Sequence, residues 1–385
     1  MNWGIYLHIP FCRRKCFYCD FPSYAGKEPY MADYTEALCR EISARGSSCR
    51  KAWGPPTTVY MGGGTPTALP LPLMEEILRA LEPIASLPGE FTVEANPGTV
   101  DPAYLECLRR RGVNRLSLGV QSFSDVLLRR MGRIHTGEEA RAAVTMAKSA
   151  GFRNISLDLI YGLPGQSLGD LQESLEEGAA LDVQHISVYG LQVEEGTVFA
   201  RQREAGELEL PGEELEEAMY DCMVRELPRL GYIRYEISNF ARPGRESRHN
   251  LGYWQDTPYL GLGAAAHSYL GDKRWENTAD LGAYIDAMGR GIFPSREEGK
   301  RTRETAMEEF AFLALRTLRG IDGEAFQRKF GCSLASVYRD VVERMKEKGL
   351  LLEDGNFVRL TELGMKYGNL VFEEFLLESD YTREQ

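Results

Sequence analysis

Three cysteines lie close together near the start of the chain, in the stretch FCRRKCFYCDF. Cys12, Cys16 and Cys19 have the spacing C-x3-C-x2-C and follow a short apolar run. Four thiolates normally hold an iron–sulfur cube, so three would leave one iron open to another ligand. The alternatives are a zinc site completed by His8 and three unrelated thiols, but zinc motifs usually have a second ligand pair downstream. The pattern favours a cluster.

The remaining cysteines and the rest of the chain indicate a reducing compartment. Five further cysteines are scattered singly, which is too few for a disulfide scaffold. The N-terminus lacks the basic segment and long apolar core of a secretory signal. The longest stretch without charges, residues 52–74, contains GGG and several prolines and does not read as a membrane span. We therefore expect a soluble cytoplasmic protein.

The first half of the chain alternates between strand-like and helix-like segments. The helix-like segments have apolar residues three and four positions apart, as at Tyr34, Leu38 and Ile42. Alternating units of this kind predict a parallel α/β sheet with helices outside, either a partial (β/α)6 barrel or a doubly wound sheet. The six predicted strands are Ile5–Ile9, Thr58–Met61, Phe91–Glu94, Arg115–Val120, Ile155–Tyr161 and His185–Leu191.

Most chemically suggestive residues lie at the ends of these strands. GGGTPT at 62–67 follows the second strand, and Glu94-Ala95-Asn96-Pro97 closes the third. Gln121 and Gln192 follow the fourth and sixth strands, and Asp158 lies in the fifth. Barrel-type α/β sheets gather their sites at the C-terminal rim of the strands. The arrangement therefore favours a barrel whose site lies at that rim.

Beyond residue 200 the pattern changes. We expect a barrel over residues 1–200, an extension over 201–297 and a separate module over 298–385. The extension has an amphipathic helix at Glu213–Leu230 and a predicted strand at Tyr235–Phe240. Three helices and a hairpin around an Asp-Gly turn make the last module resemble a winged helix. Its candidate recognition helix mixes acidic and basic residues, and the net charge is −12, so we expect no nucleic-acid partner.

The chain resembles the radical SAM superfamily, and within it the oxygen-independent coproporphyrinogen III oxidase-like family. The matching blocks are YLHIPFCRRKCFYCDF, GGGTPT, EANP, LSLGVQSF, DLIYGLP and the C-terminal module. This resemblance implies a partial six-unit barrel. It also implies a [4Fe–4S] cluster on Cys12, Cys16 and Cys19, whose open iron binds S-adenosylmethionine.

The resemblance implies a set of residues around S-adenosylmethionine. Glycine backbone can approach a ligand closely, which suits the charged end of an amino acid. A strand-end carboxylate can accept bonds from the ligand. The residues implied are Tyr6, Tyr18, Gly63, Gly64, Thr65, Glu94, Gln121, Arg133, Asp158 and Gln192.

Three features depart from the oxidases and resemble the haem-chaperone branch of the family. The cluster motif continues with Asp20 and Phe21 where the oxidases have a further cysteine, and only eleven residues precede Cys12. The stretch HNLGYW fits HNxxYW. Imidazole can ligate haem iron, and tyrosine and tryptophan can stack on a porphyrin. The haem residues implied are His249, Asn250, Tyr253 and Trp254, with His267 as a second candidate iron ligand.

Two functions follow as hypotheses. The first is a haem chaperone that carries haem, the cluster and S-adenosylmethionine and delivers haem to respiratory haem proteins. The second is a radical enzyme, such as an oxidase that decarboxylates coproporphyrinogen III, or another radical SAM enzyme acting on a tetrapyrrole. The missing cysteine and HNxxYW favour the chaperone. A reductant such as ferredoxin or flavodoxin, a homodimer and peripheral membrane contact are further expectations.

Overall fold

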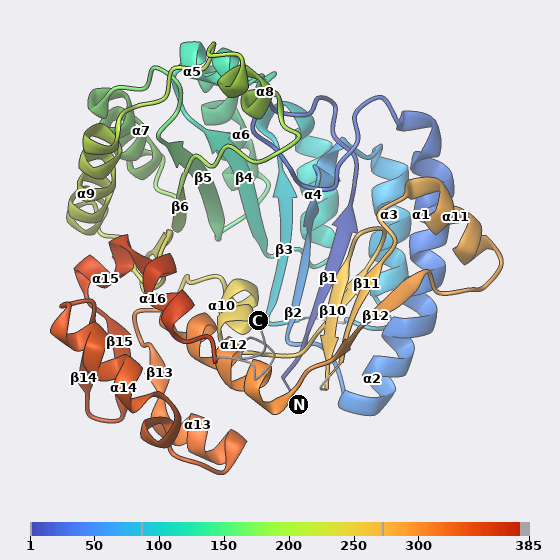
Figure 1. Ribbon diagram of the computed structural model, residues 1–385. Coiled ribbons are helices and arrows are strands. Elements are labelled where there is room, and N and C mark those ends of the chain that lie inside the picture. Colours follow the sequence, from blue (N-terminus) through green and yellow to red (C-terminus); the bar gives the residue numbers. More distant parts are fainter. Residues whose placement is uncertain (1, 86–87, 272, 378–385) are drawn as a thin grey trace.

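A sheet of twelve strands forms the body of the molecule (Figure 1). The computed structural model describes residues 2–85, 88–271 and 273–377. In the described residues the strand order is β12-β11-β10-β9-β1-β2-β3-β4-β5-β6-β8-β7. The first six strands are β1 Gly4–Ile9, β2 Thr58–Gly63, β3 Glu90–Ala95, β4 Arg115–Gln121, β5 Ile155–Tyr161 and β6 His185–Gly190.

Strands β1 to β6 follow one another in space as they do in sequence, and all neighbours among them are parallel. A doubly wound sheet would reverse its strand order at a switch point, and no reversal occurs among these strands. The outer side of β1 pairs with β9 and the outer side of β6 pairs with β8, so β1 and β6 do not pair with each other and the six strands do not close a ring. The fold is therefore the partial barrel, as predicted.

Apolar and polar side chains alternate along the strands, so the apolar ones face the helices and the polar ones face the barrel interior. Ile5, Leu7 and Ile9 of β1 are fully buried in the apolar core, whereas Tyr6 and His8 face the opposite side. Helices cover the outer side, and their ends have sequence-encoded caps, as in α6, where Thr136 and Glu139 form a capping box. The helices of this half are α1 Met31–Glu41, α2 Ser47–Trp53, α3 Leu71–Leu81, α4 Pro102–Arg110, α5 Asp125–Arg130, α6 Gly137–Ser149, α7 Leu168–Ala180 and α8 Val198–Glu204.

The middle of the chain extends the sheet on both sides. Its elements are α9 Glu213–Arg229, β7 Ile233–Arg234, β8 Asn239–Ala241, α10 Arg248–Trp254, β9 Tyr259–Leu262, β10 His267–Leu270, β11 Lys273–Asn277, α11 Leu281–Gly289 and β12 Ser295–Lys300. The strand predicted at Tyr235–Phe240 is wrong in its extent. The chain turns there between the antiparallel strands β7 and β8, because the Glu236 carboxylate accepts from the Ser238 N–H and Arg234 donates to the Ile237 carbonyl.

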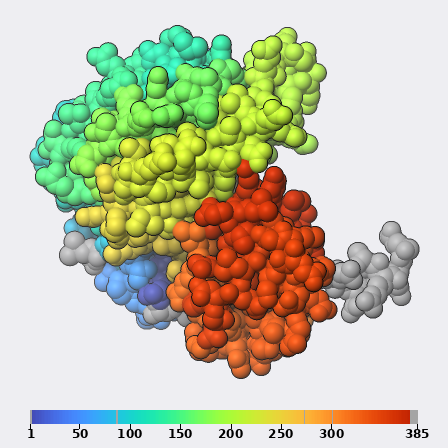
Figure 2. Space-filling model, turned by 90° about the vertical axis from the view of Figure 1, so that its left-hand side faces the viewer, coloured from blue at the N-terminus to red at the C-terminus, as the bar shows by residue number. Residues whose placement is uncertain are grey.

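The last part of the chain has an apolar cluster of its own and forms a compact lobe (Figure 2). Strands β14 and β15 make the predicted hairpin, with Gly355 and Asn356 at the turn and a φ of 61° at Gly355. No helix of the described residues is long and apolar enough to span a membrane. The elements are α12 Arg303–Leu315, β13 Ile321–Asp322, α13 Gly323–Phe330, α14 Leu334–Glu347, β14 Leu351–Asp354, β15 Phe357–Leu360, α15 Glu362–Lys366 and α16 Gly368–Glu374.

Candidate functional site

The cysteine loop lies over the C-terminal ends of the barrel strands. Backbone bonds tie it down at both ends: the Cys12 N–H donates to the Tyr24 carbonyl at 3.0 Å, and the Phe17 N–H to the Met131 carbonyl at 3.0 Å. All three cysteines of the loop are free thiols of intermediate exposure. The loop therefore presents three sulfur atoms at the rim where the sequence predicts the site.

The described residues do not favour a single zinc ion at this loop. Four ligands of one tetrahedral zinc lie within about 4 Å of one another. Within the described chain, no ligand group as tight as 4.8 Å includes these cysteines or His8. Both ring nitrogens of His8 are also occupied, by the Tyr6 hydroxyl at 3.0 Å and the Pro22 carbonyl at 2.8 Å. Three separated thiols and no fourth protein ligand fit a cluster with one open iron.

The GGGTPT segment packs directly against the cysteine loop. The Gly64 N–H donates to the Ile9 carbonyl at 2.9 Å, and the Thr65 N–H to the Phe11 carbonyl at 2.8 Å. A Cβ at Gly64 would lie 2.8 Å from both carbonyl oxygens. The φ of Gly63 is +104°, and a Cβ there would meet the His8 ring at 2.5 Å. Two of the glycines are therefore required by the fold itself, whatever ligand approaches them.

A network of polar side chains joins the motifs of four strands beneath the loop. Arg133 donates to the Cys16 sulfur at 3.4 Å and also bonds Asn96 and the Gly119 carbonyl. The Asn96 amide donates to the Thr65 hydroxyl at 2.9 Å, and that hydroxyl lies 3.6 Å from the Cys12 sulfur. Asn96 is absent from the predicted site, although the EANP motif contains it. Its position at a strand end, before a proline, is the signal that could have identified it.

Glu94 and Asp158 lie inside the barrel below this network. The Tyr60 hydroxyl donates to Glu94 at 2.6 Å, and burial raises the pKa of Glu94 to about 7. Burial also raises the pKa of Asp158, which accepts from the Ser117 hydroxyl at 3.3 Å. Tyr6 stacks near Tyr60, with ring centroids 6.3 Å apart. The interior thus offers carboxyl groups and tyrosine rings to a ligand at the rim.

Three further predicted residues differ in how closely they contact the polar network at the rim. They are Gln121, Tyr18 and Gln192. Gln121 ends β4 with a φ of +68°, next to a register shift in the sheet, and its amide approaches Gly119. Tyr18 packs near Phe199, and burial raises its pKa. Gln192 is exposed, and no hydrogen bond joins its side chain to the other described site residues. The structure therefore brings Gln121 and Tyr18 close to the network more clearly than Gln192.

The HNxxYW segment lies at the opposite end of the barrel. It forms helix α10, and the His249 N–H donates to Glu90, the first residue of β3, at 3.0 Å. The His249 ring is 3% exposed and bonds Thr58 at 2.9 Å and Tyr253 at 2.9 Å. Burial lowers the pKa of His249 to about 3. In this conformation His249 closes the floor of the barrel, with neither ring nitrogen free.

The remaining two residues of the segment also have neighbours. Asn250 is half-buried in α10, and its N–H donates to the Ser247 hydroxyl. The guanidinium of Arg316 lies 4.4 Å from the centre of the Trp254 ring. A cation over an aromatic face stabilises the pair. Trp254 therefore joins the barrel to the C-terminal lobe.

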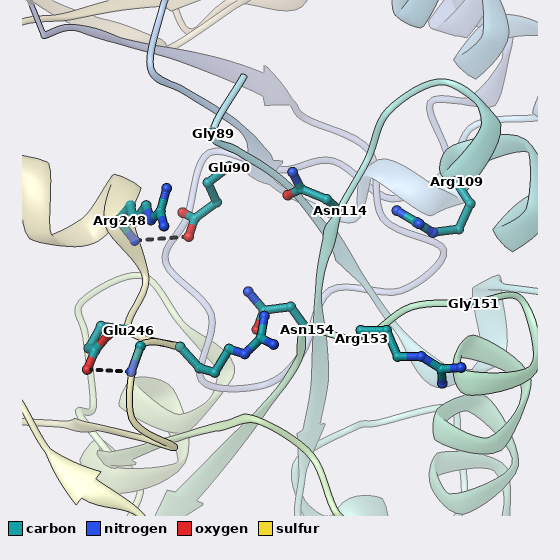
Figure 3. Close-up of a pocket in the computed structure, with 11 residues that line it drawn as sticks. Gly89, Glu90, Arg109, Asn114, Gly151, Arg153, Asn154, Glu246 and Arg248 are labelled. Carbon is teal, nitrogen blue, oxygen red and sulfur yellow. Dashed lines mark hydrogen bonds between the residues drawn. The ribbon is translucent and has the colours of Figure 1, made fainter. Parts of the chain in front are cut away.

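A polar cavity of about 260 Å³ opens at the end of the barrel where α10 lies (Figure 3). It lies among the segments that precede β3, β4 and β5, far from the cysteine loop in the fold. The lining residues are Gly89, Glu90, Arg109, Asn114, Gly151, Arg153, Asn154, Gly244, Arg245, Glu246 and Arg248. None of the residues predicted around the cluster or S-adenosylmethionine contributes to it, so the candidate site remains at the upper rim.

Two family models match the chain. Residues 6–178 match the radical SAM superfamily, and residues 302–367 match the HemN C-terminal domain. The superfamily implies a [4Fe–4S] cluster and S-adenosylmethionine, which agrees with the chemistry of the cysteine loop. The matched range contains all three cysteines, GGGTPT, EANP and Asp158.

Full-length similarities refine the assignment. The solved structure of coproporphyrinogen III oxidase (HemN) from Escherichia coli superposes with a TM-score of 0.85 at 24% identity, over 97% of this chain and 90% of that one. Heme chaperone HemW of Bacillus subtilis is 42% identical over 97% of this chain and 99% of its own. Heme chaperone HemW of Escherichia coli is 34% identical over 97% and 98%. The chain therefore belongs to the HemW family of radical SAM proteins.

Proposed function

We propose that this protein is a haem chaperone that binds haem and transfers it to respiratory haem proteins. The observation that carries the proposal is the 42% identity to a protein named heme chaperone, which extends over almost the whole of both chains. Similarity over one domain would support only a shared cofactor. Similarity that includes the middle and C-terminal parts supports a shared task.

The rim residues support a cofactor site of the family type. Cys12, Cys16 and Cys19 would hold the [4Fe–4S] cluster, which supplies electrons to S-adenosylmethionine when both are bound. Arg133 places a cation against Cys16 and therefore compensates thiolate charge. S-adenosylmethionine would lie between the loop and the interior, among Tyr6, Tyr18, Gly63, Gly64, Thr65, Glu94, Gln121, Arg133, Asp158 and Gln192. Asn96 holds this set together and is a further member.

Haem would be the cargo and not a resident cofactor. We expect the protein to work in the cytoplasm, with a ferredoxin or flavodoxin as reductant, and to contact the membrane peripherally where acceptors lie there. A homodimer is a further expectation. For His249, Asn250, Tyr253 and Trp254, the proposal is contact with haem through the tyrosine and tryptophan. Ligation of iron by His249 would first have to break its bonds to Thr58 and Tyr253.

An oxidase is the second candidate, because the fold matches the HemN structure over most of both chains. The cluster loop argues against it. Phe21 stands where the oxidases have a further cysteine, and the residue is 62% exposed. The loop therefore presents an aromatic side chain at that position, where the oxidases present a thiol.

The two candidates are separated by an assay on one preparation. The protein is reconstituted anaerobically with iron and sulfide, reduced, and given S-adenosylmethionine and coproporphyrinogen III. The chaperone proposal predicts a cluster of about four irons per chain and no decarboxylated product. Formation of protoporphyrinogen by this preparation would instead support the oxidase.

A further inference from the structure

The five histidines of the chain differ sharply in exposure. His8, His135, His185 and His249 are all buried, with at most 4% of each residue exposed. The side chain of His267 is 56% exposed. A ligand that arrives from solvent can reach only an exposed ring nitrogen without rearranging the fold. His267 is therefore the histidine most accessible to an incoming metal centre.

The hydrogen bonds of the histidine rings also single out His267 as the accessible histidine. His8 and His249 use both ring nitrogens, as described above. His185 also uses both, with Ser156 at 2.7 Å and Tyr235 at 2.8 Å. His135 is buried and bonds the Val120 carbonyl. Among the described residues, only His267 combines an exposed ring with a nitrogen that has no hydrogen-bond partner.

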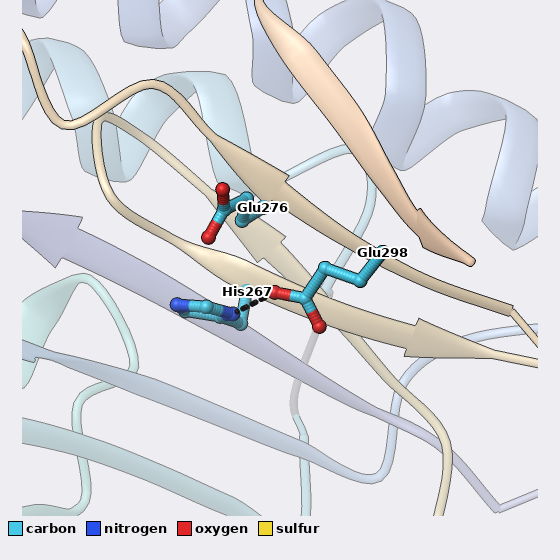
Figure 4. A group of neighbouring side chains, drawn as sticks. All are labelled: His267, Glu276 and Glu298. Carbon is cyan, nitrogen blue, oxygen red and sulfur yellow. Dashed lines mark ion pairs between the residues drawn. The ribbon is translucent and has the colours of Figure 1, made fainter. Parts of the chain in front are cut away.

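The partner of His267 prepares that free nitrogen for a metal. His267 Nδ1 lies 3.0 Å from a carboxylate oxygen of Glu298 (Figure 4). A carboxylate that accepts from one ring nitrogen fixes the tautomer, so that the lone pair is on the other nitrogen. Such carboxylate–histidine pairs commonly accompany metal-bound imidazole. The pair therefore presents Nε2 of His267 as a ready ligand atom.

The neighbouring donors favour haem over a bare metal ion. Glu276 lies across from His267 in the sheet, and one oxygen or nitrogen from each of His267, Glu276 and Glu298 lies within 4.8 Å of the others. A divalent ion would need several of these atoms at once. Glu276, however, pairs with Arg296 at 2.5 Å, and Glu298 pairs with His267. Haem iron already has four porphyrin nitrogens and can be held by a single protein ligand.

His267 lies on a strand that is connected both with the cluster rim and with the HNxxYW segment. It begins β10, just after the turn at Gly263, whose added Cβ would lie 2.6 Å from the His8 carbonyl at the cluster rim. Tyr269 is two residues along the same strand and pairs with Tyr259 of β9, so these side chains share a face with His267. Tyr259 packs on Tyr253 of HNxxYW, with ring centroids 4.7 Å apart.

We propose that His267 supplies the axial nitrogen to haem iron, with Glu298 as its positioning partner. The inference rests on the proposed function, because it assumes that haem is the cargo. It assigns the iron to the face of β9, β10, β11 and β12. HNxxYW then contributes through the tyrosine row that leads from α10 to this face, while His249 remains in the barrel floor.

Spectroscopic titration with ferric haem tests the assignment. In His267→Ala, haem affinity should fall at least tenfold and the Soret band should shift. Added imidazole should restore the wild-type band, because it replaces the missing ligand. Glu298→Gln should keep the band and lose about tenfold in affinity, the effect typical of a group that orients a metal ligand. The matched control is Glu297→Gln at the preceding residue of β12. Glu297 pairs with Lys273, and this variant should bind haem as the wild type does.

The outcomes separate this inference from the proposed function. If the wild type binds no haem, the proposed function fails, and the inference fails with it. If the wild type binds haem and His267→Ala keeps its band and affinity, the inference alone is overturned. The inference is also overturned if His267→Ala loses Zn²⁺ binding, measured by titration with zinc alone, and keeps its haem binding. Circular dichroism and iron content, both unchanged in each variant, show that the fold and the cluster loop are intact.

Discussion

The contact between GGGTPT and the cysteine loop gives the sharpest prediction from the fold. In Gly64→Ala the new Cβ would lie 2.8 Å from the carbonyl oxygens of Ile9 and Phe11 and 2.9 Å from the Phe11 nitrogen. These atoms belong to backbone, which cannot rotate away as a side chain can. Phe11 directly precedes Cys12, so the loop has to move and carry the first thiol with it.

The cost can be worked out from the contacts. Forcing a methyl group into a packed region costs about 1–3 kcal/mol. Weakening the two backbone bonds of Gly64 and Thr65 adds about 0.5–1.5 kcal/mol each. We expect a loss of about 2–6 kcal/mol in unfolding free energy.

The assay combines iron content after reconstitution with unfolding by denaturant. Gly64→Ala should lose most of its iron as well as stability. Gly98→Ala is the matched control, since Gly98 is another glycine at the rim and its added Cβ would meet nothing closer than 3.9 Å. Equal iron content and stability in Gly64→Ala and the wild type would refute this account of the motif.

Three further predictions concern the rim. Cys16→Ala should lose the cluster and its visible absorption, whereas Cys107→Ala should keep both; iron and sulfide analysis decides. Because the Glu94 pKa is raised from 4.5 to about 7, the folded state holds its proton longer than the unfolded state, so this group's stabilisation is lost as pH rises from 4.5 to 7. Glu94→Gln should remove about 3 kcal/mol of that pH dependence, measured by denaturant unfolding at both pH values. Arg133→Ala removes the donor from the Cys16 sulfur and from the Asn96 side-chain oxygen and should cost about 1.5–3 kcal/mol in stability, which thermal unfolding reports; an unchanged melting temperature would argue against the network.

The sequence predicted the barrel well because its signals are local and repeated. Each strand from β1 to β6 alternates buried apolar residues with inward polar ones, and each is followed by a helix with apolar residues at helical spacing. The error at Tyr235–Phe240 has a different origin. The side chains of Glu236 and Arg234 bond the backbone nearby and turn the chain, and a run of strand-forming residues gives no sign of that competition.

The candidate site could be predicted only in part. The motifs that contain the cysteines and Glu94 lie toward the same end of the barrel in the structure, because parallel strands end on the same side; the ligands assigned to them stay predictions. Motifs did not reveal that HNxxYW forms a helix below the barrel, since the order of residues does not say on which end of a sheet a later helix packs. The same limit hid Asn96, whose importance comes from contacts with residues more than thirty positions away. The domain boundaries near residues 200 and 297 stay predictions.

As a haem chaperone, this protein should bind haem and pass it to an acceptor. The most direct measurement mixes haem-loaded protein with an apo form of a respiratory haem protein and follows the Soret bands of donor and acceptor over time. We expect about one haem bound per chain, and transfer of that haem to the acceptor faster than the acceptor takes up free haem. Failure to bind haem, or transfer no faster than from free haem, would contradict it.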